Sequence, residues 1–207
     1  IANEYGLTPL VPGMEGPRAD KVEDVINVFD FDKYNGQGRV DYILGAKQHG
    51  GGVYVVGRCE NEFQQGYMNY YKVTNKHPYY VFLRPYHLCH LETPRAIALA
   101  ALYNKAVCTM RKGRVTDCFA YAKKDLAVGD RIEHAIGSDE VYGLIMEAKP
   151  ADASNLVPQG VLDVEGSPER PIMKRAAKKD EPLTWDHFDL PATRMLELWE
   201  KQKPLLG

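Results

Sequence analysis

The strongest constraint on the fold lies between Arg84 and Leu102, where a polar cluster runs directly into an apolar helical segment. Thr93 is a good helix N-cap because its hydroxyl accepts a hydrogen bond from a free first-turn N–H, and Pro94 fits the next position. The alanine- and leucine-rich residues that follow have high helix propensity and can be buried on all sides. The sequence therefore predicts a buried helix that starts at Thr93, just after the polar cluster.

The polar cluster combines a guanidinium, a phenol, two imidazoles and a carboxylate, on Arg84, Tyr86, His87, His90 and Glu92. Its H-x-x-H-x-E order is a candidate ligand set for zinc or a harder divalent metal. A second interpretation is anion binding with acid–base chemistry, in which Arg84 holds a phosphate or carboxylate and a histidine transfers a proton. A third is structural, with hydrogen-bonded, half-buried histidines and Glu92 complementing the helix dipole.

Composition narrows the class of protein. The 207 residues are 44% hydrophobic and 26% charged, which is typical of a soluble globular protein. A formal net charge of -2 and the lack of a basic stripe argue against nucleic-acid binding. No apolar run is long enough to span a membrane, and no signal peptide is visible. Four cysteines without C-x-x-C spacing predict a cytoplasmic, reducing setting in which they are small core residues: Cys59, Cys89, Cys108 and Cys118.

The first residue is Ile rather than Met, which leads us to expect that the chain begins inside a larger protein. No G-x-G-x-x-G motif is present, and the glycines at 36–38 and 50–52 are typical of loops. Any dinucleotide-binding half must therefore lie outside this sequence.

Short runs of β-branched and aromatic residues predict strands in the first half, beginning with Val53–Val56. The runs 66–73 and 79–83 predict an antiparallel pair. The glycine loop after Lys47 indicates either a backbone approach to a ligand or a plain hairpin. The tyrosines of these runs suit a subunit interface or two half-buried strands: Tyr67, Tyr70, Tyr71, Tyr79 and Tyr80.

The second half has short strands, predicted at 115–122 and 141–146, separated by tight turns. The tetrapeptide AKKD occurs at 122–125 and again at 177–180, which indicates two similar β-hairpin units or a chance match. A final helix over 192–201 would place Leu196 and Trp199 on one face. Together these patterns predict an α+β fold with a mixed or antiparallel sheet and helices, followed by a small β domain.

Several motifs occur in the order known from one enzyme family. They are PGMEGPR (12–18), VDYILGAK (40–47), GVYV (52–55) and PYHLCHLE (85–92), followed by AKKDL (122–126) with Gly129, IG (136–137), YG (142–143) and NLVP (155–158). On these motifs the chain resembles homoserine-dehydrogenase-like oxidoreductases with a C-terminal SAF domain. The subgroup it resembles is the 1-deoxy-D-xylulose-5-phosphate reductoisomerase-like enzymes.

The resemblance implies a nicotinamide-dependent oxidoreductase whose NADPH or NADH is bound mainly by a Rossmann domain outside this chain. Residues 1–113 would be the catalytic and substrate domain, 114–190 a SAF-like β-clip domain, and 191–207 a C-terminal helix. The enzyme would be a cytoplasmic homo-oligomer that binds a small anionic substrate and neither nucleic acid nor membrane. In the reductoisomerase-like members a sugar phosphate is rearranged and reduced to a branched polyol phosphate for isoprenoid synthesis. One departure is that residues 133–140 replace the glycine-rich SAF segment of the family.

The expected site roles follow from this resemblance. Lys47 and Arg84, with Tyr86, would hold the anionic group of the substrate. His87 or His90 would exchange a proton with the developing alkoxide. Glu92 would orient a histidine or join a divalent metal. Two alternatives remain open: a non-catalytic SAF-type binding or assembly module, and a metal-dependent lyase or isomerase that uses His87, His90 and Glu92 alone.

Overall fold

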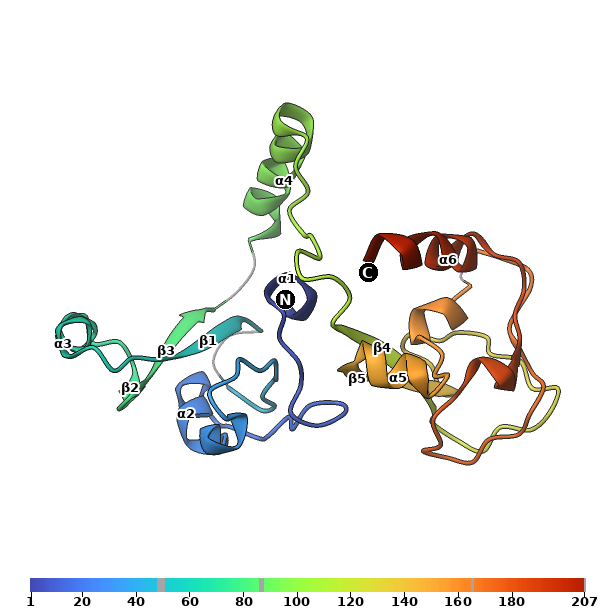
Figure 1. Cartoon of the computed structure of the whole chain (residues 1–207), viewed down its shortest axis with the longest axis horizontal. Helices are drawn as coiled ribbons and strands as arrows, with labels where there is room; N and C mark the ends of the chain where they lie inside the picture. The colour runs from blue at the N-terminus through green and yellow to red at the C-terminus, as the bar shows by residue number, and fades with distance from the viewer. Residues whose placement is uncertain (48–50, 86–87, 165, 207) are drawn as a thin grey trace. The chain divides into compact units, whose positions relative to one another are not determined.

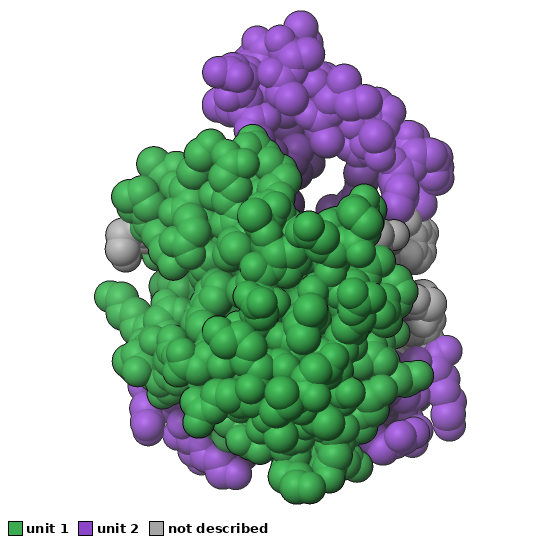
Figure 2. Space-filling model, turned by 90° about the vertical axis from the view of Figure 1, so that its right-hand side faces the viewer, with its two compact units in different colours: residues 1–14, 38–40, 109–207 green, residues 15–37, 41–108 purple. Residues whose placement is uncertain are grey.

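The structure, a computed structural model, describes residues 1–47, 51–85, 88–164 and 166–206, and it confirms the α+β class (Figure 1). The chain forms two compact units, coloured separately in Figure 2. Unit 1 comprises residues 1–14, 38–40 and 109–207, and unit 2 comprises residues 15–37 and 41–108. The first fourteen residues thus belong with the C-terminal half of the chain.

Unit 2 contains an antiparallel three-stranded sheet in the order β1-β3-β2. Val53 of β1 lies opposite Arg84 of β3, and the register continues along both strands. Alternation along the strands turns Val56 and Val81 toward a core that also holds Val25. Val55 and Phe82 therefore form the outer face. The elements of unit 2 are η1 (Val22–Asp24), α2 (Val25–Val28), η2 (Phe31–Tyr34), β1 (Val53–Arg58), α3 (Glu62–Tyr70), β2 (Asn75–Lys76), β3 (Tyr79–Arg84) and α4 (Cys89–Tyr103).

The prediction of a strand over 66–73 is wrong, because this segment lies in and just after helix α3. The side chain of Asn61 caps the helix by accepting a hydrogen bond from the backbone N–H of Gln64 at 3.0 Å. The aromatic residues recur at helical rather than strand spacing, at positions 63, 67, 70 and 71. Strand β3 pairs instead with β1, which comes earlier in the sequence.

Helix α4 differs from its prediction in two respects. It begins at Cys89 rather than Thr93, because the N–H groups of Leu91 and Glu92 already bond to the carbonyl of Leu88, both at 2.9 Å. Pro94 therefore lies inside the helix, where it lacks the N–H that would bond to the preceding turn. No residue of α4 is buried, so the prediction of a buried helix is wrong.

Unit 1 is built on the antiparallel strands β4 and β5, both predicted within one residue of their ends. The two AKKD copies lie side by side: Leu126 and Ala177 exchange backbone hydrogen bonds of 2.8 and 3.0 Å, and Lys178 pairs with Asp125 at 2.8 Å. Strands β6 and β7 form a second antiparallel pair. The elements of unit 1 are α1 (Ala2–Tyr5), β4 (Thr116–Ala122), β5 (Val141–Glu147), α5 (Ala148–Ala153), η3 (Gln159–Leu162), β6 (Ile172–Met173), η4 (Trp185–His187), β7 (Phe188–Asp189) and α6 (Arg194–Leu206).

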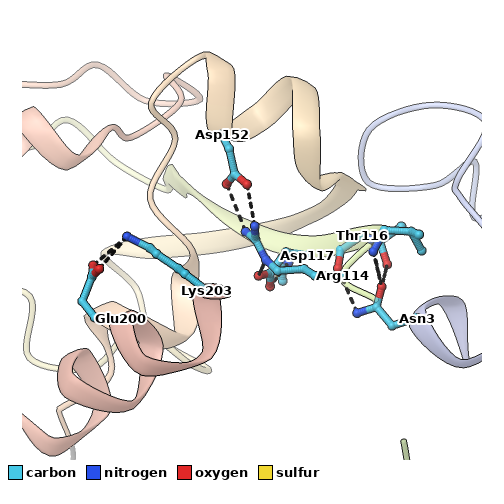
Figure 3. A network of polar contacts seen from close by, with 9 residues as sticks. Asn3, Arg114, Thr116, Asp117, Asp152, Glu200 and Lys203 are labelled. Atoms are coloured by element: carbon cyan, nitrogen blue, oxygen red, sulfur yellow. Dashed lines mark hydrogen bonds and ion pairs between the residues drawn. The ribbon is translucent and has the colours of Figure 1, made fainter. Parts of the chain in front are cut away.

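Helix α6 turns Leu196 and Trp199 inward, as predicted, while its other face is exposed. The ring of Trp199 lies 4.5 Å from the guanidinium carbon of Arg114. The same guanidinium donates to Asp117 at 2.6 Å and to both carboxylate oxygens of Asp152, at 2.5 and 3.1 Å (Figure 3). Arg114 thus joins the start of β4 to α5 and α6.

The cysteines do not all behave as small core residues. Cys89 and Cys108 are exposed, and Cys59 and Cys118 are half-buried. For the first two residues the prediction is wrong, because both lie in the α4 region, where no residue is buried. None of the described helices combines the length and apolar character needed to cross a membrane.

Candidate functional site

The end of β3 and the start of β1 form one end of the unit 2 sheet, and Arg84 is the last residue of β3. Gly52 lies against this end: a Cβ at this position would lie 2.7 Å from the carbonyl oxygen of Arg84 and 3.1 Å from that of Pro85. Only glycine fits there. Gly52 thus lies close to the backbone of the chain itself, and the approach to a ligand at the glycine loop remains a prediction.

Arg84 forms an ion pair with Glu92, which lies in the first turn of α4. The side chains are 63% and 37% exposed. An exposed pair of this kind contributes about 0–1 kcal/mol, because water solvates both partners. A negatively charged ligand can therefore compete with Glu92 for the guanidinium at little cost. The structure brings together these two predicted site residues from the end of a strand and the start of a helix.

His90 also lies in the first turn of α4, and it is exposed. Its imidazole is therefore open to solvent. Tyr86 and His87 lie outside the described residues, so their predicted roles remain predictions. Among the residues that the structure describes, no three His, Cys, Asp or Glu side chains gather to hold a metal ion. The H-x-x-H-x-E set includes His87, so it stays untested.

Lys47 lies at the end of a pairing between two loops. One loop carries the motif at 12–18, and the other carries the motif at 40–47. Arg18 bridges Leu44 in parallel, and the ladder continues to the N–H of Lys47, which donates to the carbonyl of Asp20 at 3.0 Å. The ammonium of Lys47 lies 3.5 Å from the Asp20 carboxylate, and both side chains are 80% exposed. Like Arg84, this predicted anion-binding cation is thus held by a weak, solvent-exposed partner.

Asp41 was not predicted as a site residue, yet it fixes the first motif in place. Its carboxylate accepts backbone N–H groups from Glu15 and Gly16, each at 3.0 Å, and from Tyr42 at 2.8 Å. The Tyr42 ring covers Gly16, where a Cβ would lie 2.4 Å from the ring and φ is +53°. A charged acceptor with three amide donors is a rigid anchor. The motif at 12–18 is therefore positioned by the motif at 40–47.

Tyr54 of β1 lies beside this anchor and was also not predicted. Its hydroxyl is buried and has no hydrogen-bond partner within the described part of the chain. Burial, and then the charge of Asp41, raise the pKa of Tyr54 well above the ordinary value for a phenol. Burial and the charge of Glu15 act in the same direction on the pKa of Tyr34. Both phenols stay neutral at physiological pH and can donate a hydrogen bond. The alternation of β1 could have indicated Tyr54, but nothing in the sequence pairs it with Asp41.

A hollow of about 260 Å³ lies at the opposite end of the sheet from Arg84. It is lined by the end of β1, the start of β3 and helix α3, including Cys59, Gln64, Met68 and Tyr80. Arg58 at its rim pairs with Glu60. Of the predicted cluster, the described residues Arg84, His90 and Glu92 do not line this hollow, so the hollow is a feature separate from them.

Residues 1–93 match the family model described as the catalytic domain of the oxidoreductase DRL. The match ends just after Glu92, and it includes Lys47, Arg84 and His90 as well as the Asp41 anchor. It supports an oxidoreductase role for this chain. Comparison with curated proteins gives no match.

Proposed function

We propose that this chain supplies the substrate-binding part of a nicotinamide-dependent oxidoreductase that acts on a small anionic substrate of the phosphorylated-sugar type. The observation that carries the proposal is the exposed Arg84–Glu92 pair at the end of β3, inside the segment that matches an oxidoreductase catalytic domain. A guanidinium can bind a phosphate or carboxylate through two parallel hydrogen bonds. The substrate's anionic group would replace Glu92 as the partner of Arg84.

His90, which is exposed in the first turn of α4, would exchange a proton with the reacting oxygen of such a substrate. A positioned general acid or base contributes roughly a factor of 10² to 10⁴ in rate. Lys47 is a second cation for the anionic group, and Tyr86 and His87 are further candidates in the same segment. Glu92, released from Arg84, would orient a histidine or join a divalent metal.

The hydride would come from NADPH or NADH. The sequence has no G-x-G-x-x-G motif, so these residues do not fit a dinucleotide site. A metal-assisted reaction would use His87, His90 and Glu92 as candidate ligands. Stoichiometric zinc or manganese in the purified protein would support a metal-assisted reaction.

The direct test follows NADPH oxidation by the full-length protein with 1-deoxy-D-xylulose 5-phosphate as the first substrate. Turnover supports a reductoisomerase-like reaction. Cofactor binding without turnover retains the oxidoreductase class and directs the search to other sugar acids and phosphates. Failure to bind either nicotinamide cofactor rejects the proposal in favour of a non-catalytic binding module.

Arg84→Ala tests the anion site. Loss of a charge-assisted hydrogen bond, about 1.5–3 kcal/mol, should raise KM roughly 10- to 100-fold. The matched control is Arg58→Ala, which removes another exposed Arg–Glu pair at the opposite end of β1 and should leave KM unchanged. Equal kinetics for the Arg84 variant and the wild type would reject the assignment.

A further inference from the structure

The hollow of about 260 Å³ in unit 2 has a specific origin in the register of the sheet. At this end of the sheet the chain leaves β1, forms α3 and returns through β2 to β3 (Figure 1). Gly57 of β1 lies opposite Tyr80 of β3, and paired residues of antiparallel strands share one face of the sheet. Because Gly57 has no side chain, space is left beside the Tyr80 ring, and a Cβ at position 57 would lie 3.7 Å from the Phe82 ring, an ordinary contact. The hollow therefore follows from the strand pairing.

Tyr80 lines this hollow, and its hydroxyl is buried without a hydrogen-bond partner in the described part of the chain. The residue is only 1% exposed, so bulk water does not reach the hydroxyl. A buried phenol normally finds a partner, because a hydroxyl removed from water without a new hydrogen bond destabilises the protein. The missing partner of Tyr80 therefore points to a molecule that enters the hollow.

The lining of the hollow carries no net charge. Its charged side chains, Arg58 and Glu60, pair with each other at the rim. A charged ligand would thus meet no unpaired opposite charge, and it would lose its hydration on entering the hollow. The lining therefore favours an uncharged ligand.

The other walls suit a flat ring. Met68 and Phe82 line the hollow together with Tyr80, and thioether and aromatic side chains pack well against an aromatic ligand. The side-chain amide of Gln64 adds a hydrogen-bond donor and acceptor. A cavity of about 150 Å³ holds benzene, so 260 Å³ has room for one ring with a small polar substituent. The hollow is smaller than the roughly 300–1,000 Å³ of a site for drug-sized ligands.

We propose that the hollow binds a small uncharged aromatic ligand whose carbonyl or amide oxygen accepts a hydrogen bond from Tyr80. The site lies at the opposite end of the sheet from Arg84, and its test does not depend on the oxidoreductase reaction. Benzamide is the probe, because it joins one ring to a neutral amide. Benzoate is the matched control ligand, because it has nearly the same size and shape but carries a negative charge.

Cys59 provides the measurement, since this half-buried cysteine also lines the hollow. Benzamide at millimolar concentration should slow the alkylation of Cys59 by iodoacetamide in the full chain roughly threefold or more, as expected for a Kd of about 1 mM. Mass spectrometry of the peptides gives the rate for each cysteine. Cys89, which is exposed on α4, is the internal control and should react at the same rate with and without benzamide. Benzoate should leave both rates unchanged.

Two variants test the assignment of the hydroxyl and of the space beside it. Tyr80→Phe removes only the hydroxyl and should weaken benzamide binding roughly 3- to 10-fold, the effect of one lost hydrogen bond. The melting temperature of the free variant, followed by circular dichroism, should stay unchanged or rise, because the hydroxyl has no partner there. Gly57→Val fills the space beside Tyr80 with a residue that suits a strand, so it should abolish the protection of Cys59.

Protection of Cys59 that is weakened in Tyr80→Phe and lost in Gly57→Val supports the proposal. It is overturned if benzamide protects neither cysteine or protects Cys59 and Cys89 equally, and also if benzoate protects Cys59 as well as benzamide does. Undiminished protection in either variant overturns it too. A lower melting temperature of free Tyr80→Phe overturns it in favour of a hydroxyl that already has a partner, such as a trapped water molecule.

Discussion

The two units differ in how far they bury their apolar side chains. In unit 1, residues from strands, turns and loops enclose one another, and Phe119, Ile132, Leu162 and Leu183 are all 0% exposed. In unit 2 the core is a thin layer between α2 and one face of the sheet, while α3 and α4 have no buried residue. Unit 1 therefore encloses a fully buried core, whereas unit 2 leaves large apolar side chains of α3 and α4 exposed.

The largest expected effect is in the core of unit 1. Phe119→Ala should lower the free energy of unfolding by about 3–5 kcal/mol, because it removes a fully buried ring and leaves a cavity. Both tryptophans, Trp185 and Trp199, lie in unit 1, so denaturation followed by tryptophan fluorescence reports this unit alone. Val128→Ala in the same unit, at a side chain 67% exposed, should change stability by less than about 0.5 kcal/mol. Similar losses for both variants would contradict a closed core.

The next largest expected effect is a difference in stability between variants of two arginines. Arg114→Met should cost about 2–3 kcal/mol, because Arg114 is only 14% exposed and its loss leaves two carboxylates without their shared partner. Arg84→Met should cost less than about 1 kcal/mol, since its pair with Glu92 is solvated. Urea unfolding measures the loss of stability in Arg114→Met, and hydrogen exchange of β3 measures the loss in Arg84→Met. An equally large loss at Arg84 would show that its pair has a structural role.

Two glycines of unit 2 should respond in opposite directions. Gly52→Ala should destabilise the sheet by about 1–3 kcal/mol, because the new methyl group would collide with the Arg84 carbonyl. Gly66→Ala should stabilise α3 by about 0.5–1 kcal/mol, since Gly66 lies inside the helix with no atom near its missing Cβ. Hydrogen exchange of β1 and α3 measures both, and the tryptophan signal of unit 1 should not move. A neutral Gly52→Ala would mean that the sheet end is free to adjust.

The smallest effect concerns the contact between the AKKD copies. The hydrogen bond from Lys178, followed by the N–H of Lys179, lowers the pKa of Asp125 below its ordinary value. The contact between Asp125 and Lys178 therefore stabilises the folded state at pH values above the ordinary aspartate pKa. This stabilisation is lost as the pH falls through the lowered pKa of Asp125 in the folded state. Lys178→Met should raise the Asp125 pKa toward its ordinary value in a carboxyl NMR titration. Lys124→Met, which removes a pair with Glu140 instead, should leave it unchanged.

Local patterns predicted the parts of the fold that depend on neighbours in sequence. Strands β4 and β5 follow from runs of β-branched and aromatic residues, and the inward face of α6 follows from the spacing of Leu196 and Trp199. Helix α3 was mistaken for a strand because its tyrosines have high β propensity, although their spacing is helical. The buried state of α4 could not be predicted from the chain alone, because burial depends on what packs against the helix.

The same distinction holds for the site. Arg84 and Glu92 lie eight residues apart in one polar cluster, which the sequence indicated as a site, although it did not predict that the two side chains pair. Asp41 and Glu15 are 26 residues apart, and no pattern links a carboxylate to backbone amides at that distance. The contact of Asp41 with Glu15 and Gly16 depends on the register of the two loops, which places the motifs at 12–18 and 40–47 side by side.

The attachment of α1 has a consequence for protein synthesis. The side chain of Asn3 accepts hydrogen bonds from the N–H groups of Val115, at 3.0 Å, and Thr116, at 2.9 Å, across 112 and 113 residues of chain. All of unit 2 is translated between these partners. The ribosome must therefore deliver the whole of unit 2 before α1 can dock, so unit 2 can fold first and unit 1 closes only after the chain has returned to it.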